Sequence, residues 1–292
     1  MGMNFFKTTF LLTLLTLLLV GFGQMLGGQQ GMMVALMFSL AMNLGAYWFS
    51  DKMVLSFYRA QPLSEQDAPE VHALLQEICS AANLPFPKVY LIPSAQPNAF
   101  ATGRNPQHAV VAVTEGILQQ LGAEELQGVL AHEMGHVQHR DILISTIAAS
   151  LAGALSMLAS MARYAFMFGG SQPRSRDDRG GGGQHPLGLL VAVILMPIAA
   201  ALIQLAVSRS REYAADEWGG KMCGNPLYLA SALRKLEAAS KTLPLRGAAE
   251  ATAHLFIVNP LRGNPWAGLF STHPPMEERI ARLEEAARAM GL

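Results

Sequence analysis

The sequence is poor in charged residues. Asp, Glu, Lys and Arg make up 14% of its 292 residues, whereas they supply about a quarter of an average soluble domain. The 21 basic and 21 acidic residues cancel, so no excess positive field exists to hold nucleic acid. Hydrophobic residues make up 51%. This composition excludes nucleic acid as a partner and indicates a membrane protein.

Cysteine is also scarce. The two cysteines, Cys79 and Cys223, lie far apart and form no CxxC or CxxxC pair. This excludes a disulfide framework and a thiolate zinc site. We expect both to be buried free thiols.

Long uncharged runs are abundant. A helix needs about 20 mostly apolar residues to cross a bilayer, and four segments approach or meet that length: 8–26, 31–49, 142–168 and 187–207. The first is followed at once by the second and shows no A-x-A cleavage pattern, which argues against a signal peptide. We therefore predict four transmembrane helices, in an N-terminal hairpin over 1–50 and a second hairpin over 142–207, whose Gly- and Arg-rich loop is 169–186.

Basic residues beside the first hairpin predict its orientation. Lys7, Lys52 and Arg59 lie on one side and none lies in the connecting "GGQQG", so the termini and the soluble part of the chain should face the cytoplasm. The second loop opposes this assignment, because it would place four arginines outside: Arg163, Arg174, Arg176 and Arg179.

The remaining chain, 51–141 and 208–292, is predicted to form one mostly helical α+β unit. "KVYLIPS", "NAFATG" and "HAVVAV" are β-prone runs bounded by turn residues. Helical patterns precede and follow them, the first opened by Ser64 with Asp67 three residues on. The last helical pattern before the second hairpin is "GAEELQGVLAHEMGHVQHR".

The segment "AHEMGHV" contains HExxH, with His132, Glu133 and His136. Residues four apart share one face of a helix, so the two imidazoles can hold one metal ion while Glu133 projects beside them. The uncharged intervening residues and the helical context favour a zinc-dependent hydrolase over two histidines on an ordinary amphipathic helix.

A catalytic zinc ion takes three protein ligands and keeps an open position. The metzincin spacing would require a histidine at position 142, which is Ile142. His139 is a weaker alternative, since three ligands from two turns of one helix strain a tetrahedron. Glu212 in "SRSREYAADEWG" is favoured. Asp216, four residues on, could orient a ligating histidine.

These motifs carry a family resemblance. "AHEMGHVQHRD", two apolar spans and "SRSREYAADEWG", together with "PNAFATG" and "STHPPMEERI", resemble the HtpX branch of membrane zinc metalloproteases, which is related to the CAAX prenyl proteases. The resemblance implies a gluzincin-type domain with one zinc ion per chain on His132, His136 and Glu212, and Glu133 as the catalytic residue. It also implies a heat-shock-linked, cytoplasm-facing endopeptidase of the inner membrane that clears damaged membrane proteins.

The ligand segments flank the second hairpin. His136 lies six residues before Ile142 and Glu212 five after Val207. If one helix continues from His136 into the span, the separation is about 9 Å at about 1.5 Å per residue. If both segments bind one ion, the two ends of the second hairpin must lie on the same side of the membrane. A single crossing of the membrane is therefore excluded, and the metal should lie near the bilayer surface.

Two further residues are candidates for contact with substrate. His273 in "STHPP" could stabilise the oxyanion, although a turn histidine before two prolines is an equal alternative. "NAFATG" could be an edge strand that pairs with an extended polypeptide. Asn98 could help there, or serve the turn after Pro97.

Two rival functions compete with an endopeptidase of misfolded membrane proteins. A CAAX-type protease would trim lipidated C-termini, but four spans offer little intramembrane room. A catalytically silent zinc scaffold has no need of Glu133. A transporter is disfavoured because no ionisable residue lies mid-span.

Overall fold

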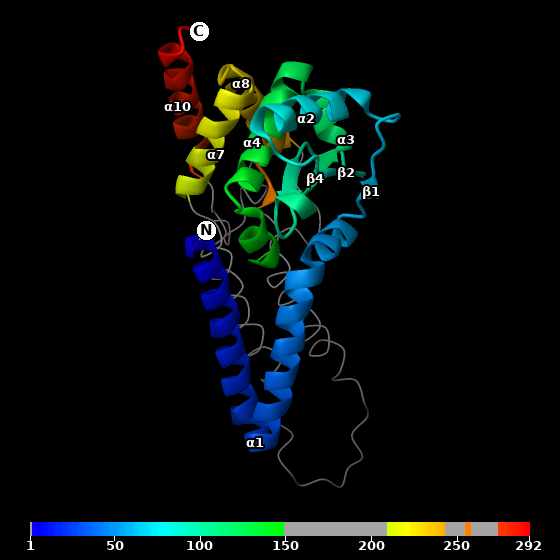
Figure 1. The fold of residues 1–292 in the computed structure, drawn as a ribbon, viewed down its shortest axis with the longest axis vertical. Coiled ribbons are helices and arrows are strands. Elements are labelled where there is room, and N and C mark those ends of the chain that lie inside the picture. The colour runs from blue at the N-terminus through cyan, green and yellow to red at the C-terminus, as the bar shows by residue number, and fades with distance from the viewer. Residues whose placement is uncertain (1, 149–208, 243–254, 258–273) are drawn as a thin grey trace, which may run out of the picture.

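The computed structural model describes residues 2–148, 209–242, 255–257 and 274–292. The predicted loop 169–186, the span 187–207 and His273 lie outside these residues, as does all but the start of the span 142–168. Figure 1 shows a long helical hairpin that leads into a body of helices and short strands.

The N-terminal hairpin is helix α1, Gly2–Phe57, which bends sharply at Gly27 and Gly28. Gly28 has a φ of 57°, which costs glycine little, and the chain reverses there (Figure 1). The arms touch near the bend, where a Cβ on Gly31 would lie 2.2 Å from the Gly23 carbonyl oxygen. The predicted hairpin over 1–50 is therefore helical, and its helix continues to Phe57.

One helix within the described ranges is long and apolar enough to cross a membrane: the second arm of α1, Gly27–Phe57. The first arm contributes only a shorter apolar helix, over Leu12–Gly21. The side chains of the second arm are mostly exposed, as expected of a helix in contact with lipid. The total of four transmembrane helices stays a prediction.

A four-stranded sheet forms the centre of the globular part, in the order β1-β2-β4-β3. Strand β2 (Lys88–Ile92) runs parallel to β4 (Val110–Thr114). Strand β3 (Ala99–Thr102) runs antiparallel to β4 and forms one edge. These are the three predicted strands. The two-residue β1 (Gln61–Pro62) was not predicted, because it is too short to show alternation.

The two faces of the sheet are covered by different layers. Val89, Val111 and Val113 face a large core built mainly by helices α2 (Pro69–Ala82) and α4 (Ala123–Gln138). The alternate residues face a smaller cluster that includes Val54 and Leu55 from the end of α1. The membrane hairpin is therefore packed directly on the sheet.

The remaining helices complete the shell: α3 (Glu115–Gln120), α7 (Arg209–Met222), α8 (Leu227–Thr242) and α10 (Met276–Ala289), with the 3₁₀ turn η1 at Pro106–His108. The four α-helices lie in segments with helical patterns that follow the β-prone runs, whereas η1 was not predicted. Helix α4 lies between α2, α7 and α8, and it is buried on nearly every side.

Two local predictions were wrong. Helix α2 begins at Pro69 after Ala68, without a side-chain cap, because Ser64 and Asp67 bond each other in the turn before it. The helix from His136 is also not continuous with the span. It ends at Gln138, and Arg140 has a φ of 58° before helical structure resumes at 142–148.

The two thiols are free, as predicted. Cys79 is buried and Cys223 half-buried. Burial raises the pKa of the Cys79 thiol to about 11 and that of Cys223 to about 12. Both are therefore protonated and unreactive at neutral pH.

Candidate active site

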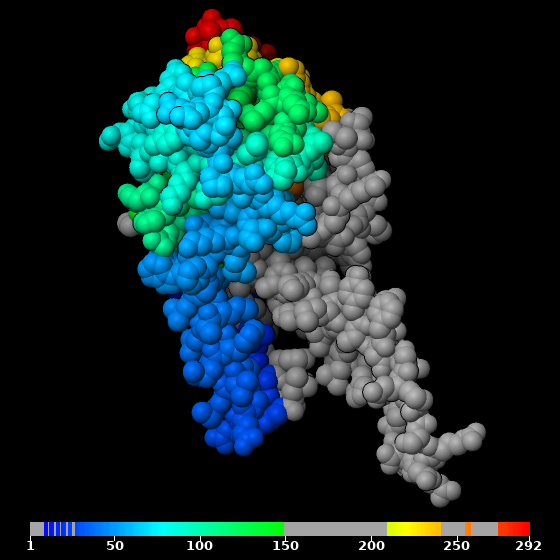
Figure 2. Space-filling model, turned by 90° about the vertical axis from the view of Figure 1, so that its right-hand side faces the viewer, coloured from blue at the N-terminus to red at the C-terminus, as the bar shows by residue number. Residues whose placement is uncertain are grey.

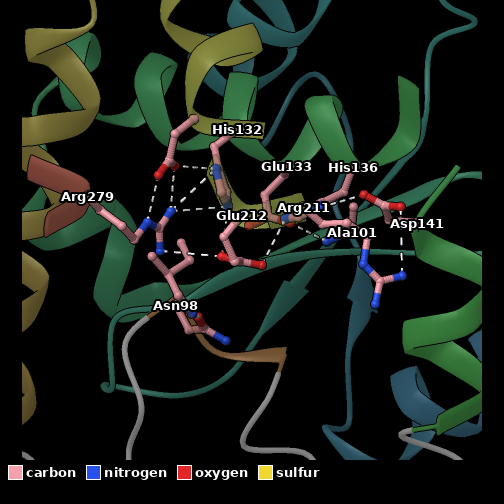
Figure 3. Close-up of polar contacts among 11 residues, drawn as sticks. Asn98, Ala101, His132, Glu133, His136, Asp141, Arg211, Glu212 and Arg279 are labelled. Atoms are coloured by element: carbon pink, nitrogen blue, oxygen red, sulfur yellow. Dashed lines mark hydrogen bonds and ion pairs between the residues drawn. The ribbon is translucent and has the colours of Figure 1, made fainter. Parts of the chain in front are cut away.

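Three predicted metal ligands meet between α4 and α7. His132, His136 and Glu212 each offer one ligand atom, and these atoms lie within 4.8 Å of one another. The Glu212 carboxylate spans both imidazoles, with Oε2 3.8 Å from His132 Nε2 and Oε1 3.5 Å from His136 Nε2 (Figure 3). His132 and Glu212 are buried, and His136 is slightly exposed.

Glycines let the two ligand helices approach closely. A Cβ on Gly219 of α7 would lie 2.9 Å from the backbone nitrogen of His132. A Cβ on Gly135 of α4 would lie 3.1 Å from Cα of Ala215. Such contacts tolerate almost no added volume. The bare backbone at these positions brings a carboxylate on α7 within reach of imidazoles on α4.

Asp216 orients the first histidine. Its Oδ1 lies 2.9 Å from His132 Nδ1, on the ring nitrogen opposite Nε2, which faces Glu212. A carboxylate in this position fixes the tautomer of a ligating imidazole. This is the placement expected from the spacing of Glu212 and Asp216.

Arg279 was missed by the sequence analysis. It lies on α10, is fully buried, and donates to both Asp216 oxygens at 2.8 and 2.6 Å. Its Nη1 is 3.5 Å from Glu212 Oε2. The guanidinium holds the pKa of Asp216 well below its usual range, despite the opposing effect of burial. The segment "MEERI" belongs to a motif that carries the family resemblance, but its charged helical pattern does not mark this arginine as buried.

A second carboxylate faces the other histidine. Asp141 Oδ2 is 3.5 Å from His136 Nδ1, and its Oδ1 is 3.9 Å from Arg211 Nη1. The helix break after Gln138 produces this contact, since the Asp141 N–H donates back to the His136 carbonyl. Each histidine therefore has a carboxylate behind it, and each carboxylate has an arginine near it (Figure 3).

Glu133 is the buried carboxylate next to the ligand set. Its Oε2 accepts a 2.8 Å hydrogen bond from the Ala101 N–H of β3. Burial raises the pKa of the Glu133 carboxyl, while His132 and His136 oppose that rise. A carboxyl held in this state can accept a proton nearer neutral pH than an ordinary glutamate can.

Asn98 is close to the site, but its side chain is already engaged. Its amide donates to the Leu255 carbonyl at 3.4 Å and accepts from the Ile257 N–H at 3.1 Å. The side chain is buried. These two hydrogen bonds of Asn98 hold segment 255–257 next to the start of β3. His139 is exposed at the end of α4, outside the ligand set.

The donor set suits a metal ion. Two imidazole nitrogens and one carboxylate oxygen are the ligands found in catalytic zinc sites, which leave a position for water or substrate. The carboxylates beside the two imidazoles also fit a metal site, because the ring nitrogen of a ligating histidine that does not bind the metal almost always bonds a carboxylate or a carbonyl. Asp216 and Asp141 occupy these positions. The residues therefore fit the predicted cofactor.

Comparisons with known proteins place the chain in a family. The family described as Peptidase family M48 matches residues 65–287. Two similar relatives are named "Protease HtpX homolog". The one from Syntrophobacter fumaroxidans is 58% identical over 95% of this chain and 98% of its own length. The one from Pyrococcus furiosus is 52% identical over 98% and 97%.

A crystal structure of S. mikatae Ste24p matches with 20% identity and a TM-score of 0.49, over 94% of this chain and 62% of that one. The resemblance to HtpX that the motifs indicated is confirmed by the relatives. With a family match over three quarters of the chain and relatives more than half identical over nearly all of it, the protein belongs to peptidase family M48 and is a metallopeptidase.

Proposed function

We propose that this membrane metallopeptidase is a zinc-dependent endopeptidase that cleaves misfolded or damaged membrane proteins at the cytoplasmic surface of a bacterial-type inner membrane. The observation that carries the proposal is the buried set of His132, His136 and Glu212 beside Glu133, in a body packed on the end of an apolar helix.

His132, His136 and Glu212 would hold the zinc ion. When bound, zinc supplies a water molecule of lowered pKa and polarises the scissile carbonyl. Asp216 and Asp141 keep the two imidazoles oriented through their Nδ1 atoms. Arg279 balances the charge of the buried carboxylates around His132.

Glu133 moves the proton. The Ala101 N–H fixes its Oε2, so the proton of the attacking water is taken at Oε1 and then delivered to the leaving amine. Removing this carboxyl should abolish catalysis and leave the ligand set intact. His273 stays our candidate for the oxyanion.

Strand β3 would receive the substrate. In the sheet it pairs only with β4. The Thr114 N–H donates to the Asn98 carbonyl, so the main-chain groups of Ala99 and Ala101 point to the other edge. The Ala101 N–H binds Glu133 there, which leaves the N–H of Ala99 and the carbonyls of both residues for a substrate. An extended polypeptide can add there by main-chain hydrogen bonds. Such pairing reads little side-chain chemistry, which suits a protease for diverse damaged proteins.

Two features support the cytoplasmic orientation. The two ends of the α1 hairpin lie at the same end of the molecule, beside the globular body (Figure 1). Lys7, Lys52 and Arg59 flank these ends, and basic residues mark the cytoplasmic side. If residues 142–207 cross the membrane an even number of times, α4 and α7 lie on the same side of it.

The two rivals differ in substrate or in catalysis. A CAAX-type protease would need lipidated C-termini, and an edge strand that reads main chain gives no reason for that restriction. A zinc scaffold needs no base, yet Glu133 is buried beside the ligand set with a raised pKa, and burial of a carboxyl costs stability.

The test compares the purified parent with Glu133→Gln. Both are stripped with chelator, reloaded with zinc and incubated with an unfolded reporter such as casein. Both should bind one zinc per chain, and only the parent should cleave, in a zinc-dependent manner. Zinc binding by both without cleavage by either would support the scaffold and refute the mechanism. A lipidated CAAX peptide preferred to casein would favour the first rival.

A further inference from the structure

The predicted span 31–49, in the second arm of α1, ends in a cluster of exposed aromatic residues. Tyr47, Trp48 and Phe49 are consecutive, with Trp48 51% and Phe49 53% exposed. Aromatic side chains with a polar edge gather where a spanning helix leaves the hydrocarbon for the headgroups. Lys52 follows one turn later, so this stretch marks the headgroup level.

The globular body adds a second cation at this level. Arg104, in the loop after β3, places its guanidinium carbon 4.7 Å from the centre of the Trp48 ring. Lys52 Nζ lies 5.6 Å from the Phe49 ring. Trp48 and Lys52 are four residues apart and share a face of the helix. In the described part of the chain, neither cation pairs with a carboxylate.

We propose that Trp48, Lys52 and Arg104 form a docking site for anionic phospholipid headgroups, which holds the catalytic body on the bilayer. Two cations without carboxylate partners and an exposed indole at the end of an apolar helix are complementary to a lipid phosphate and the glycerol region beneath it. A guanidinium binds phosphate oxygens in a planar fork. The position at the end of the span selects lipid over a soluble anion.

The docking site is joined rigidly to the catalytic glutamate. Arg104 is three residues from Ala101, whose N–H binds Glu133. Between them, Gly103 has a φ of 127°, and a Cβ there would lie 2.2 Å from the His108 carbonyl oxygen. Thr102 Oγ1 is also bonded to Thr146 Oγ1 at 2.9 Å.

This short link has little freedom, because the Gly103 N–H donates to Thr146 Oγ1 at 3.4 Å and the Thr102 hydroxyl bonds the same buried oxygen. A lipid that holds Arg104 therefore also holds β3, the proposed substrate strand, in place over Glu133. We expect proteolysis to depend on anionic lipid. This consequence rests on the proposed function, whereas the binding of lipid does not.

The experiment reconstitutes the full chain in nanodiscs of phosphatidylcholine, with or without phosphatidylglycerol. Phosphatidylglycerol retained after detergent extraction is measured by mass spectrometry on the Glu133→Gln background, which needs no activity. In the parent, kcat/KM is measured on a short uncharged peptide, so that the lipid charge does not act on the substrate. Phosphatidylglycerol should raise kcat/KM.

Two variants, Lys52→Gln and Arg104→Gln, should each weaken phosphatidylglycerol retention about fivefold, as expected for one basic residue at an anionic surface. Each should also reduce the activation by phosphatidylglycerol. Arg104→Lys keeps the charge and should retain most of both effects. Lys88→Gln, at an exposed residue at the start of β2, removes a charge elsewhere and should change neither.

Equal retention by the parent and the Gln variants would overturn the docking site. Retention that falls while kcat/KM stays insensitive to lipid would overturn the link to Glu133. Arg104→Gln could also lose the same activity with and without phosphatidylglycerol. The arginine would then support the fold or bind an acidic protein segment, and this result would overturn the proposal as well. Absence of cleavage by the parent in either lipid would refute the proposed function and leave the retention result standing.

Discussion

Replacing Arg279 by methionine should destabilise the protein and weaken its metal site together. Methionine fills a similar volume without charge. Arg279 is fully buried and makes two short bonds to Asp216, and it lies 3.5 Å from Glu212. The variant leaves two buried carboxylates without their cation, and Asp216 loses the group that holds its pKa low.

The structure sets the size of the effect. Breaking a buried ion pair by removing one partner costs about 3–5 kcal/mol. At roughly 2–4 °C per kcal/mol for a chain of this size, the unfolding midpoint should fall by about 6–20 °C. Loss of the group that orients a ligating histidine lowers metal affinity by about 10–100-fold. Asp216 remains in Arg279→Met but is no longer held in place.

Thermal unfolding in detergent, with and without zinc, measures the first effect, and competition with a fluorescent chelator measures the second. Lys221→Met is the matched control, because its 2.6 Å pair with Glu217 is exposed and such pairs contribute at most about 1 kcal/mol. Adding Asp216→Asn to Arg279→Met should recover part of the stability and none of the zinc affinity. An Arg279→Met midpoint equal to that of Lys221→Met would refute this account of the buried charges.

Two other predictions concern the same metal site. Hydrogen bonding to Asp141 and the charge of Glu212 outweigh the lowering by burial and raise the pKa of His136 to about 9. Zinc must therefore displace a proton, and its affinity for the metal-free protein should rise about tenfold per pH unit near neutrality. Calorimetry at several pH values measures this, and an affinity that does not change with pH would contradict it. Gly219→Ala would place a Cβ 2.9 Å from the His132 nitrogen, force α7 away from α4 and lower both zinc affinity and the unfolding midpoint. Gly45→Ala, in helix α1 with no neighbour within 4 Å, is the control and should leave the zinc affinity unchanged.

Local pattern was enough to find the chemistry. HExxH places two imidazoles on one face of any helix that contains it, and ExxxD does the same for two carboxylates, so His132, Glu133, His136, Glu212 and Asp216 could be named without tertiary structure. The strands 88–92 and 110–114 were also recoverable, because β-branched residues between turn residues fit a buried strand.

The helix break at 139–141 could not be read from the sequence. A polar stretch, "QHRD", continues a helical pattern as well as it ends one. The left-handed Arg140 and the return bond from Asp141 to the His136 carbonyl become favourable only where they carry the Asp141 carboxylate to an imidazole.

What the sequence by itself determined is which side chains are the candidates for the reaction, because periodicity along one element is a property of the chain alone. Only the tertiary structure decided which groups surround them. Arg279 reaches Asp216 across 63 residues and Asn98 reaches Ile257 across 159. Such contacts join elements that are far apart in the sequence and are buried in the folded protein. They exist only once the helices have packed, because a buried charge is stabilised by partners that no local pattern specifies.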